Sequence, residues 1–126
     1  MSIERIQPAG IPPSALYSHV VRTGNLVFIA GQVGQDESGK IIGEGDFTAQ
    51  ATQTFENLKK ALASVGMDLT NLVQIRNYVT DARFRDPLRE INLKYLPTDQ
   101  PASTLLVVQA LARPELLIEI DAVAAF

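Results

Sequence analysis

The sequence contains no cysteine and only one histidine, His19. Without cysteine the chain has no disulfide, no thiolate nucleophile and no sign of an oxidising compartment. A single imidazole leaves no ligand set for zinc, and a site built from carboxylates alone would need a cluster of Asp and Glu that the sequence lacks. We therefore expect neither a metal nor a cofactor, with the cytoplasm as the default location.

Long apolar runs and a surplus of basic residues are also missing. No apolar run approaches the roughly 18 residues of a membrane span, and the first ten residues carry Glu4 and Arg5 where a secretory signal needs an apolar core. The net charge is −3 and the basic residues are scattered, so we expect no membrane and no nucleic-acid partner. Neither a Gly-x-Ser-x-Gly motif nor a phosphate-binding P-loop occurs.

What is present indicates one domain covering residues 1–126, long enough for a core of its own. An apolar residue recurs every three or four positions after Asp46, which predicts an N-capped helix of about 20 residues that ends at Gly66. Asp86 and Pro87 predict the start of a second, shorter helix, which Pro97 stops. Short apolar runs predict strands at residues 3–6, about 18–22, 26–30, 72–80, 104–108 and 116–123.

This order of elements predicts an α+β domain with both helices on one face of a mixed sheet. The last two apolar runs read as strands that are buried on both faces. Two helices cannot cover both faces of the sheet, so we expect copies of the chain to cover the other one.

Polar residues within these apolar segments are the candidates for function. Glu119 and Asp121 share one face of the last strand, where they either line a cleft or pair with basic residues across a subunit boundary. Asn92 lies on the apolar side of the second helix, where it either supports nearby backbone or contacts a ligand. Tyr17 reads as an interface aromatic, and His19 as a packed side chain whose hydrogen bonds are satisfied.

Several motifs resemble the RidA/YjgF family, whose active members are deaminases of reactive enamines and imines. They follow the family's order along almost the whole chain. They are Tyr17 in the loop at 13–20, Ala-Gly-Gln at 30–32, Ala-x-Gln-Thr-Phe-x-Asn-Leu at 51–58, Tyr-Val-Thr-Asp at 78–81, Ile-Asn-x-x-Tyr at 91–95, Pro-Ala at 101–102 and Ile-Glu-Ile-Asp-Ala at 118–122.

The resemblance implies the YjgF-like (chorismate-mutase-like) fold, assembled as a homotrimer with small-molecule clefts at the subunit boundaries. It implies that Tyr17, the backbone at Gly31 and Asn92 line the cleft, and that Glu119 positions or activates water. An iminium is already electrophilic, so an oriented water and a proton acceptor are sufficient for its hydrolysis.

The chain departs from the family at two positions of this cleft. Ser103 stands where active members carry an arginine that holds the substrate carboxylate, and Ala30 replaces a serine before the glycine. Loss of the arginine removes about 1.5–3 kcal/mol per charge-assisted hydrogen bond. Two functions remain open: hydrolysis of an imine or enamine other than a typical 2-imino acid, or a non-catalytic trimer that binds a small metabolite or a partner.

Overall fold

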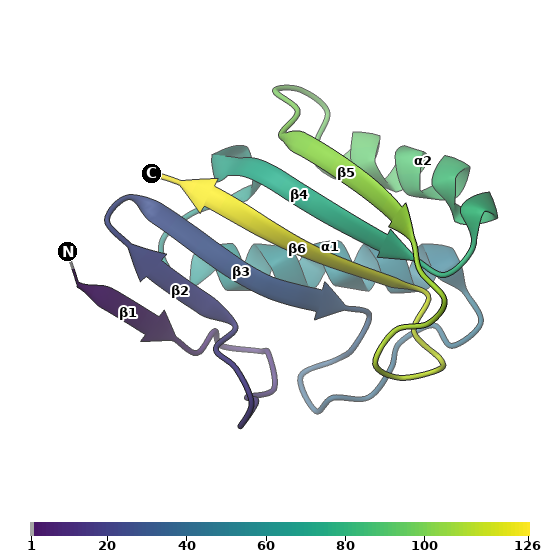
Figure 1. Ribbon diagram of the computed structural model, residues 1–126, viewed down its shortest axis with the longest axis horizontal. Helices are drawn as coiled ribbons and strands as arrows, with labels where there is room; N and C mark the ends of the chain where they lie inside the picture. The colour runs from purple at the N-terminus through teal and green to yellow at the C-terminus, as the bar shows by residue number, and fades with distance from the viewer. Residues whose placement is uncertain (1) are drawn as a thin grey trace.

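The computed structural model describes residues 2–126, which form one sheet of six strands with two α-helices behind it (Figure 1). The predicted α+β domain is confirmed. The elements are β1 (Ile3–Ile6), β2 (Val20–Thr23), β3 (Leu26–Val33), α1 (Phe47–Ala63), β4 (Leu72–Val79), α2 (Arg85–Tyr95), β5 (Ala102–Val107) and β6 (Ile118–Ala125), with 3-10 turns η1 (Leu69–Asn71) and η2 (Ala82–Phe84).

The strand that comes last in the chain lies in the interior of the sheet. The strand order is β1-β2-β3-β6-β4-β5, and β6 pairs antiparallel with both β3 and β4. β4 and β5 are parallel and are joined through α2, whereas β1, β2 and β3 form an antiparallel meander. The expected mixed sheet is therefore present, with β1 and β5 as its edges.

Helix α1 follows the predicted pattern closely. The Asp46 side chain accepts a hydrogen bond from the Ala49 backbone N–H, so Asp46 is the N-cap. The helix ends at Ala63, slightly earlier than expected, and Gly66 follows in the left-handed conformation with φ 75°. The apolar stripe of the helix packs on the sheet, with Phe55, Leu58 and Leu62 fully buried.

Helix α2 begins differently from the prediction. Asp86 is not the N-cap: the helix continues directly from η2, it starts at Arg85, and its cap residue Phe84 makes no side-chain cap hydrogen bond. Pro87 thus sits third in the helix, still within the first turn, where its missing N–H leaves no hydrogen bond unmade. Asp81 instead caps η2 by accepting from the Arg83 N–H. The helix ends at Tyr95, ahead of Pro97, as expected.

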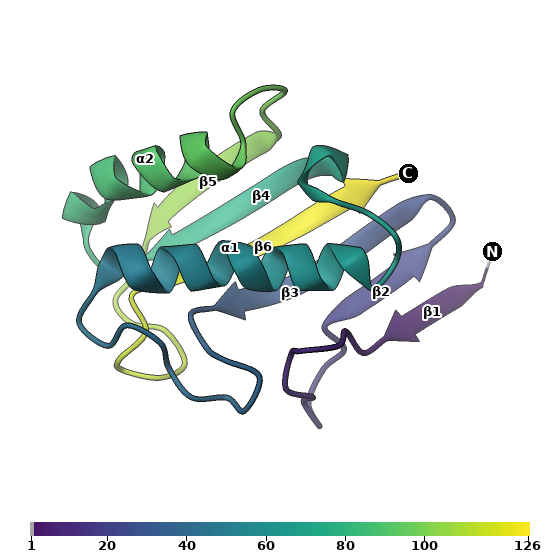
Figure 2. The same ribbon diagram turned by 180° about the vertical axis from the view of Figure 1, so that it is seen from behind.

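Both helices lie on one face of the sheet, as predicted (Figure 2), and no helix of residues 2–126 covers the opposite, open face, which is in front in Figure 1. Along β6 the residues alternate between the two faces: Ile118, Ile120 and Ala122 face the helices, while Glu119 and Asp121 face the open side. The expectation that the last two strands are buried on both faces is wrong for the single chain. β6 is buried on one face only, and every residue of β5 is exposed because β5 is an edge strand.

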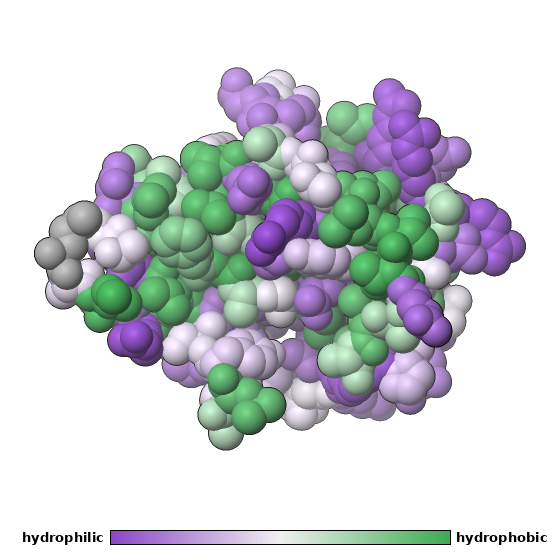
Figure 3. Space-filling view, in the orientation of Figure 1, coloured by the Kyte–Doolittle hydropathy of each residue, from purple (hydrophilic) through white to green (hydrophobic). Residues whose placement is uncertain are grey.

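The open face carries apolar side chains on both sides of a polar centre. Figure 3, which views this face, shows hydrophobic surface over the β2–β3 side and over the end of β5, with hydrophilic residues between. The large exposed apolar residues of β3 and β5 on this face are Leu26, Phe28 and Leu106. Leu105 and Val107 of β5 are also exposed, but they pair with Asn77 and Val79 and so point to the helix side. Neither helix of the described chain is long and apolar enough to cross a membrane.

Candidate active site

The Glu119 carboxylate lies on the open face of the sheet, beside the end of β3. Glu119 is half-buried and stands opposite Tyr78 of β4. Together with Tyr17, Ala30, Gly31 and Ala112 it lines a hollow of about 320 Å³. The structure therefore brings three of the five predicted site residues, Tyr17, Gly31 and Glu119, to one place.

Gly31 is in close contact with the Glu119 side chain. The register between β3 and β6 shifts between Ile29 and Gln32, so strand β3, predicted to stop at Ala30, continues past Gly31 through an irregular pairing. A Cβ added at Gly31 would lie 2.5 Å from Glu119 Oε2 and 2.6 Å from Glu119 Cδ. The absence of a side chain at Gly31 is what makes room for the carboxyl group.

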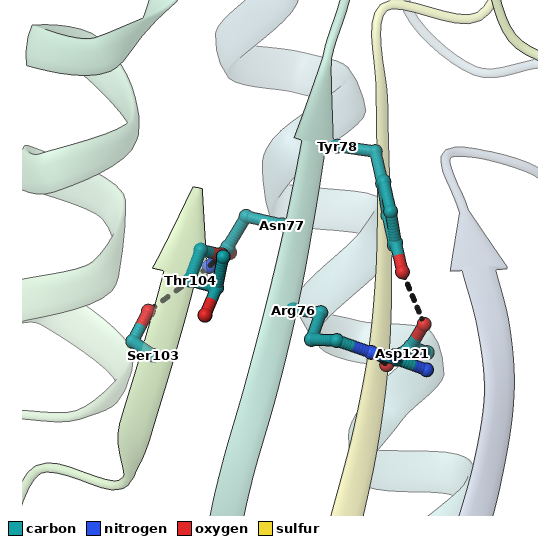
Figure 4. A network of polar contacts seen from close by, with 6 residues as sticks. All are labelled: Arg76, Asn77, Tyr78, Ser103, Thr104 and Asp121. Carbon is teal, nitrogen blue, oxygen red and sulfur yellow. Dashed lines mark hydrogen bonds and ion pairs between the residues drawn. The ribbon is translucent and has the colours of Figure 1, made fainter. Parts of the chain in front are cut away.

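The two acidic residues of β6 have different surroundings. Asp121 accepts a hydrogen bond from Arg76 Nε at 2.8 Å and another from the Tyr78 hydroxyl at 2.9 Å (Figure 4). The charge and hydrogen bond of Asp121 raise the pKa of Arg76. Burial and the Asp121 hydrogen bond raise the pKa of Tyr78. Asp121 is thus the acceptor of an ion pair within one chain, whereas the ion pair predicted from the sequence was one across a subunit boundary.

Glu119 has no such partner among residues 2–126. Burial, and then the negative charge of Asp121, raise the pKa of the Glu119 carboxyl group. A desolvated carboxylate with a raised pKa binds a proton more readily than an ordinary surface glutamate, which is the property that a general base needs.

His19 supports the loop that carries Tyr17. It is 2 % exposed; its Nε2 lies 2.9 Å from the Pro12 carbonyl oxygen and its Nδ1 lies 3.1 Å from Gln32 Nε2. This arrangement fits a neutral imidazole that donates to Pro12 and accepts from Gln32. The imidazole also meets the Tyr17 ring edge to face, with centroids 5.2 Å apart. The packed, hydrogen-bonded role predicted for His19 is confirmed.

Ser103 lies on the other face of the sheet from Glu119. It pairs with Ile75 of β4, and residues paired across two strands point to the same face. Ile75 is in the core under the helices, whereas Glu119 shares the open face with Tyr78 and Asp121. A single chain therefore does not bring Ser103 and Glu119 into one cavity.

Asn92 is on α2, away from the Glu119 hollow. Its Oδ1 is buried and has no hydrogen-bond partner within the described chain. Within residues 2–126 that oxygen makes no bond to nearby backbone, which was one of the two roles predicted for Asn92. The five predicted site residues thus fall into two groups, with Tyr17, Gly31 and Glu119 in one and Asn92 and Ser103 elsewhere.

Comparison with known proteins identifies the family of this chain. Residues 8–126 match the family model described as Endoribonuclease L-PSP, the RidA/YjgF family. The chain belongs to this family.

Two curated relatives in the RidA/YjgF family have names that state an activity. The chain is 30% identical over 125 residues to a protein of Acinetobacter baylyi named 3-aminoacrylate deaminase RutC, covering 98% of each chain. It is 31% identical over 124 residues to the human protein named 2-iminobutanoate/2-iminopropanoate deaminase, covering 97% of this chain and 90% of the human one.

Solved structures of the RidA/YjgF family have the same fold. The crystal structure of RidA from a Psychrobacter species superposes with a TM-score of 0.91 at 30% identity, covering 98% of this chain and 99% of the other. The resemblance inferred from the motifs is thereby confirmed as to family and fold.

Sequence reasoning did not predict that polar residues of β4 contact Asp121 on one face of the sheet and Ser103 on the other. Arg76 and Tyr78 contact Asp121, while Asn77 turns to the helix side and contacts Ser103 (Figure 4). The alternation of Arg76, Asn77 and Tyr78 along a strand is visible in the sequence, but their partners come from strands 26–45 residues further along the chain. No cluster of three or more potential metal ligands occurs among residues 2–126.

Proposed function

We propose that the protein hydrolyses a reactive imine or enamine to a carbonyl compound and ammonia, with Glu119 as the general base. The observation that carries this proposal is the Glu119 carboxyl group itself. It is half-buried, its pKa is raised by burial, and it lies against Gly31 in a hollow next to Tyr17.

The reaction needs little more than this carboxylate. Glu119 takes a proton from a water molecule while the water oxygen bonds to the imine carbon and the C=N electron pair moves to nitrogen. A proton then passes to the nitrogen of the resulting carbinolamine, ammonia leaves, and the carbonyl group forms. The negative charge of Glu119, which has no basic partner among residues 2–126, favours the positively charged iminium over the neutral imine, which raises the electrophilicity of the carbon.

The cleft in this proposal lies between two copies of the chain in a homotrimer. Ser103 and Glu119 are on opposite faces of the sheet, and Asn92 is on a helix behind it. These residues line one cleft only if one copy supplies Tyr17, Gly31 and Glu119 and its neighbour supplies Asn92 and Ser103. The exposed apolar residues of β5 and the open sheet face are the surfaces that such an assembly covers.

We further propose that the substrate is not a typical 2-imino acid. Ser103 offers one neutral hydroxyl where a carboxylate would need charge-assisted donors. Arg76 is no substitute within one chain, because it lies beside Asp121 on the open face. The endoribonuclease description of the family finds no support in these residues, since the single histidine is engaged in structural hydrogen bonds and the net charge is −3.

Ammonia release from imines generated in situ tests the proposal. An amine oxidase acting on a primary amine supplies an imine without a carboxylate, and an amino-acid oxidase supplies a 2-imino acid. We expect the protein to accelerate ammonia release from the first imine more than from the second. Glu119→Gln removes the base with almost no change in shape and should abolish the acceleration. Ser103→Arg should increase the rate with 2-imino acids, including 2-aminoacrylate.

The replacement of the arginine by Ser103 also favours a second function, a trimer that binds a metabolite without converting it. That function would be supported if neither imine were hydrolysed faster and a small metabolite still raised the melting temperature. Rapid turnover of a 2-imino acid by the unaltered protein, abolished by Glu119→Ala, would contradict the proposed substrate class while supporting the chemistry.

A further inference from the structure

Asn77 of β4 donates a part-buried hydrogen bond to Ser103, which is itself exposed on the edge strand β5. Asn77 is 1% exposed, and its Nδ2 donates to Ser103 Oγ at 3.1 Å and to the Thr104 carbonyl oxygen at 3.0 Å (Figure 4). Both hydrogens of the amide nitrogen are used, so the orientation of the side chain is determined. The Ser103 oxygen accepts from Asn77, which leaves the Ser103 proton free to be donated elsewhere.

The oxygen of the Asn77 amide makes no hydrogen bond of its own to residues 2–126. Asn77 Oδ1 is buried without a hydrogen-bond partner in the described chain, and a buried unsatisfied carbonyl oxygen is destabilising. A valine at this position would remove the unpaired Oδ1, and it would also remove the donor from which Ser103 Oγ and the Thr104 carbonyl oxygen accept. The asparagine thus carries one unpaired buried oxygen and in return holds residues 103 and 104 of β5 through two hydrogen bonds.

We propose that Asn77 is a positioning residue that makes Ser103 a donor for a neutral carbonyl group, so that the substrate carries a carboxamide or similar group where relatives bind a carboxylate. This inference rests on the proposed function for its choice of ligand. A single neutral hydroxyl gives a carboxamide oxygen the one hydrogen bond it needs. It leaves a carboxylate without the charge-assisted partners that would replace its lost hydration.

The negative charge of Glu119 also favours a neutral group over a carboxylate in the substrate. Glu119 has no basic partner among residues 2–126, and Asp121 already neutralises Arg76. In the proposed cleft a substrate carboxylate would approach the negative charge of Glu119 without an arginine at position 103. A neutral carboxamide avoids this repulsion.

The test compares two ligands that differ only in this group, 2-oxopropanamide and 2-oxopropanoate. Each is the carbonyl product of one substrate class, so their binding is measured by NMR titration without turnover. We expect the unaltered protein to bind the amide more tightly than the acid, by about fivefold to tenfold, the ratio that corresponds to one neutral hydrogen bond. The backbone amides of β5 should report the binding.

Four variants separate a role in specificity from a role in folding. Asn77→Val and Ser103→Ala should each lower the preference for the amide to the part that repulsion between Glu119 and the carboxylate supplies, and Ser103→Thr, which retains the hydroxyl, should preserve the preference in full. Ser103→Arg should reverse the preference. Damage to the fold would weaken both ligands equally and leave the ratio unchanged. We also expect Asn77→Val to change the melting temperature little, because the unpaired Oδ1 and the donor to the Thr104 carbonyl oxygen are removed together.

Tighter binding of the acid by the unaltered protein would overturn the inference, as would failure to bind either ligand. An unchanged ratio in Asn77→Val together with a lowered preference in Ser103→Ala would show that Ser103 acts without Asn77, and would also overturn it. Because these readouts need no catalysis, loss of the proposed deaminase activity and loss of this specificity are distinguished.

Discussion

Gly31 and Glu119 occupy neighbouring strands so closely that a single methyl group on Gly31 would displace the carboxylate. The Cβ of an alanine at position 31 would lie 2.5 Å from Glu119 Oε2. No positive φ is involved at Gly31, so the constraint comes from contact and not from backbone conformation. The position of the proposed base is thus determined by the residue beside it.

The first prediction concerns this contact. Gly31→Ala should fold, because the Glu119 side chain can turn away at a cost of about 0.5–1.5 kcal/mol. It should nevertheless lose ammonia-releasing activity as fully as Glu119→Ala does. The double variant Gly31→Ala/Glu119→Ala should recover the stability lost in Gly31→Ala, measured by urea unfolding. Gly34→Ala is the matched control: its Cβ would lie 2.9 Å from the Gln50 Cα, which cannot turn away, so it should be more destabilising. Full activity in Gly31→Ala would contradict the assignment of Glu119 as the base.

The second prediction follows from the raised pKa of Glu119. A carboxyl group whose pKa is higher in the folded state binds protons more tightly when folded, so its contribution to stability is greatest at low pH. That contribution is lost as pH rises from the ordinary value of 4.5 through the raised folded value. Glu119→Gln should therefore be more stable than the unaltered protein at pH 7, and the difference should shrink below pH 4.5. Chemical unfolding of both proteins across this range measures the difference, and a difference that did not change with pH would contradict the prediction.

The third prediction separates His19 from catalysis. His19→Ala removes the hydrogen bonds of the imidazole to the Pro12 carbonyl oxygen and to the Gln32 amide nitrogen, which keeps its bond to the Ala30 carbonyl oxygen, and should destabilise the fold by about 1–3 kcal/mol. His19→Gln, which can still donate to Pro12, should recover part of this stability and of any activity. A variant that folds with full stability but has no turnover would instead indicate a chemical role for the imidazole.

The fourth prediction tests the assembly. Leu106 pairs with Tyr78 on the open face of the sheet and is exposed in the single chain. Leu106→Lys should lower the mass measured by light scattering from three chains to one, because a lysine would lose hydration in the proposed interface. Leu93, an exposed residue of α2, provides the control, and Leu93→Lys should leave the mass unchanged. If the unaltered protein had the mass of one chain, the proposal of a cleft between copies would fail.

Local patterns in the sequence predicted the elements well, and long-range pairing accounts for most of what they missed. The stripe of α1 and its Asp46 cap were predictable because they depend on residues within a few positions of one another. The start of α2 was misplaced because η2 passes directly into it, so that Asp81, and not Asp86, acts as a cap. The alternation of Glu119 and Asp121 onto one face of β6 was likewise predictable from period-two geometry.

The environment of the site residues was not predictable in this way. No local pattern shows that β6 lies between β3 and β4, and this position determines which partners its carboxylates meet. The pairing of Asn77 with Ser103 joins residues 26 positions apart and appears only when β4 and β5 align. Glu119 could be singled out from its position in an apolar strand, whereas its contact with Gly31 and its lack of a basic partner required the structure.

The central place of β6 also has a consequence during synthesis of the chain. Until β6 has left the ribosome, neither β3 nor β4 can form its native pairing with β6, so one edge of each of these strands stays unpaired. Those edges are open to pairing with other nascent chains, and the delay ends only when β6 inserts between them. Chaperones that shield strand edges should therefore matter most to this protein in the moments before its sixth strand emerges.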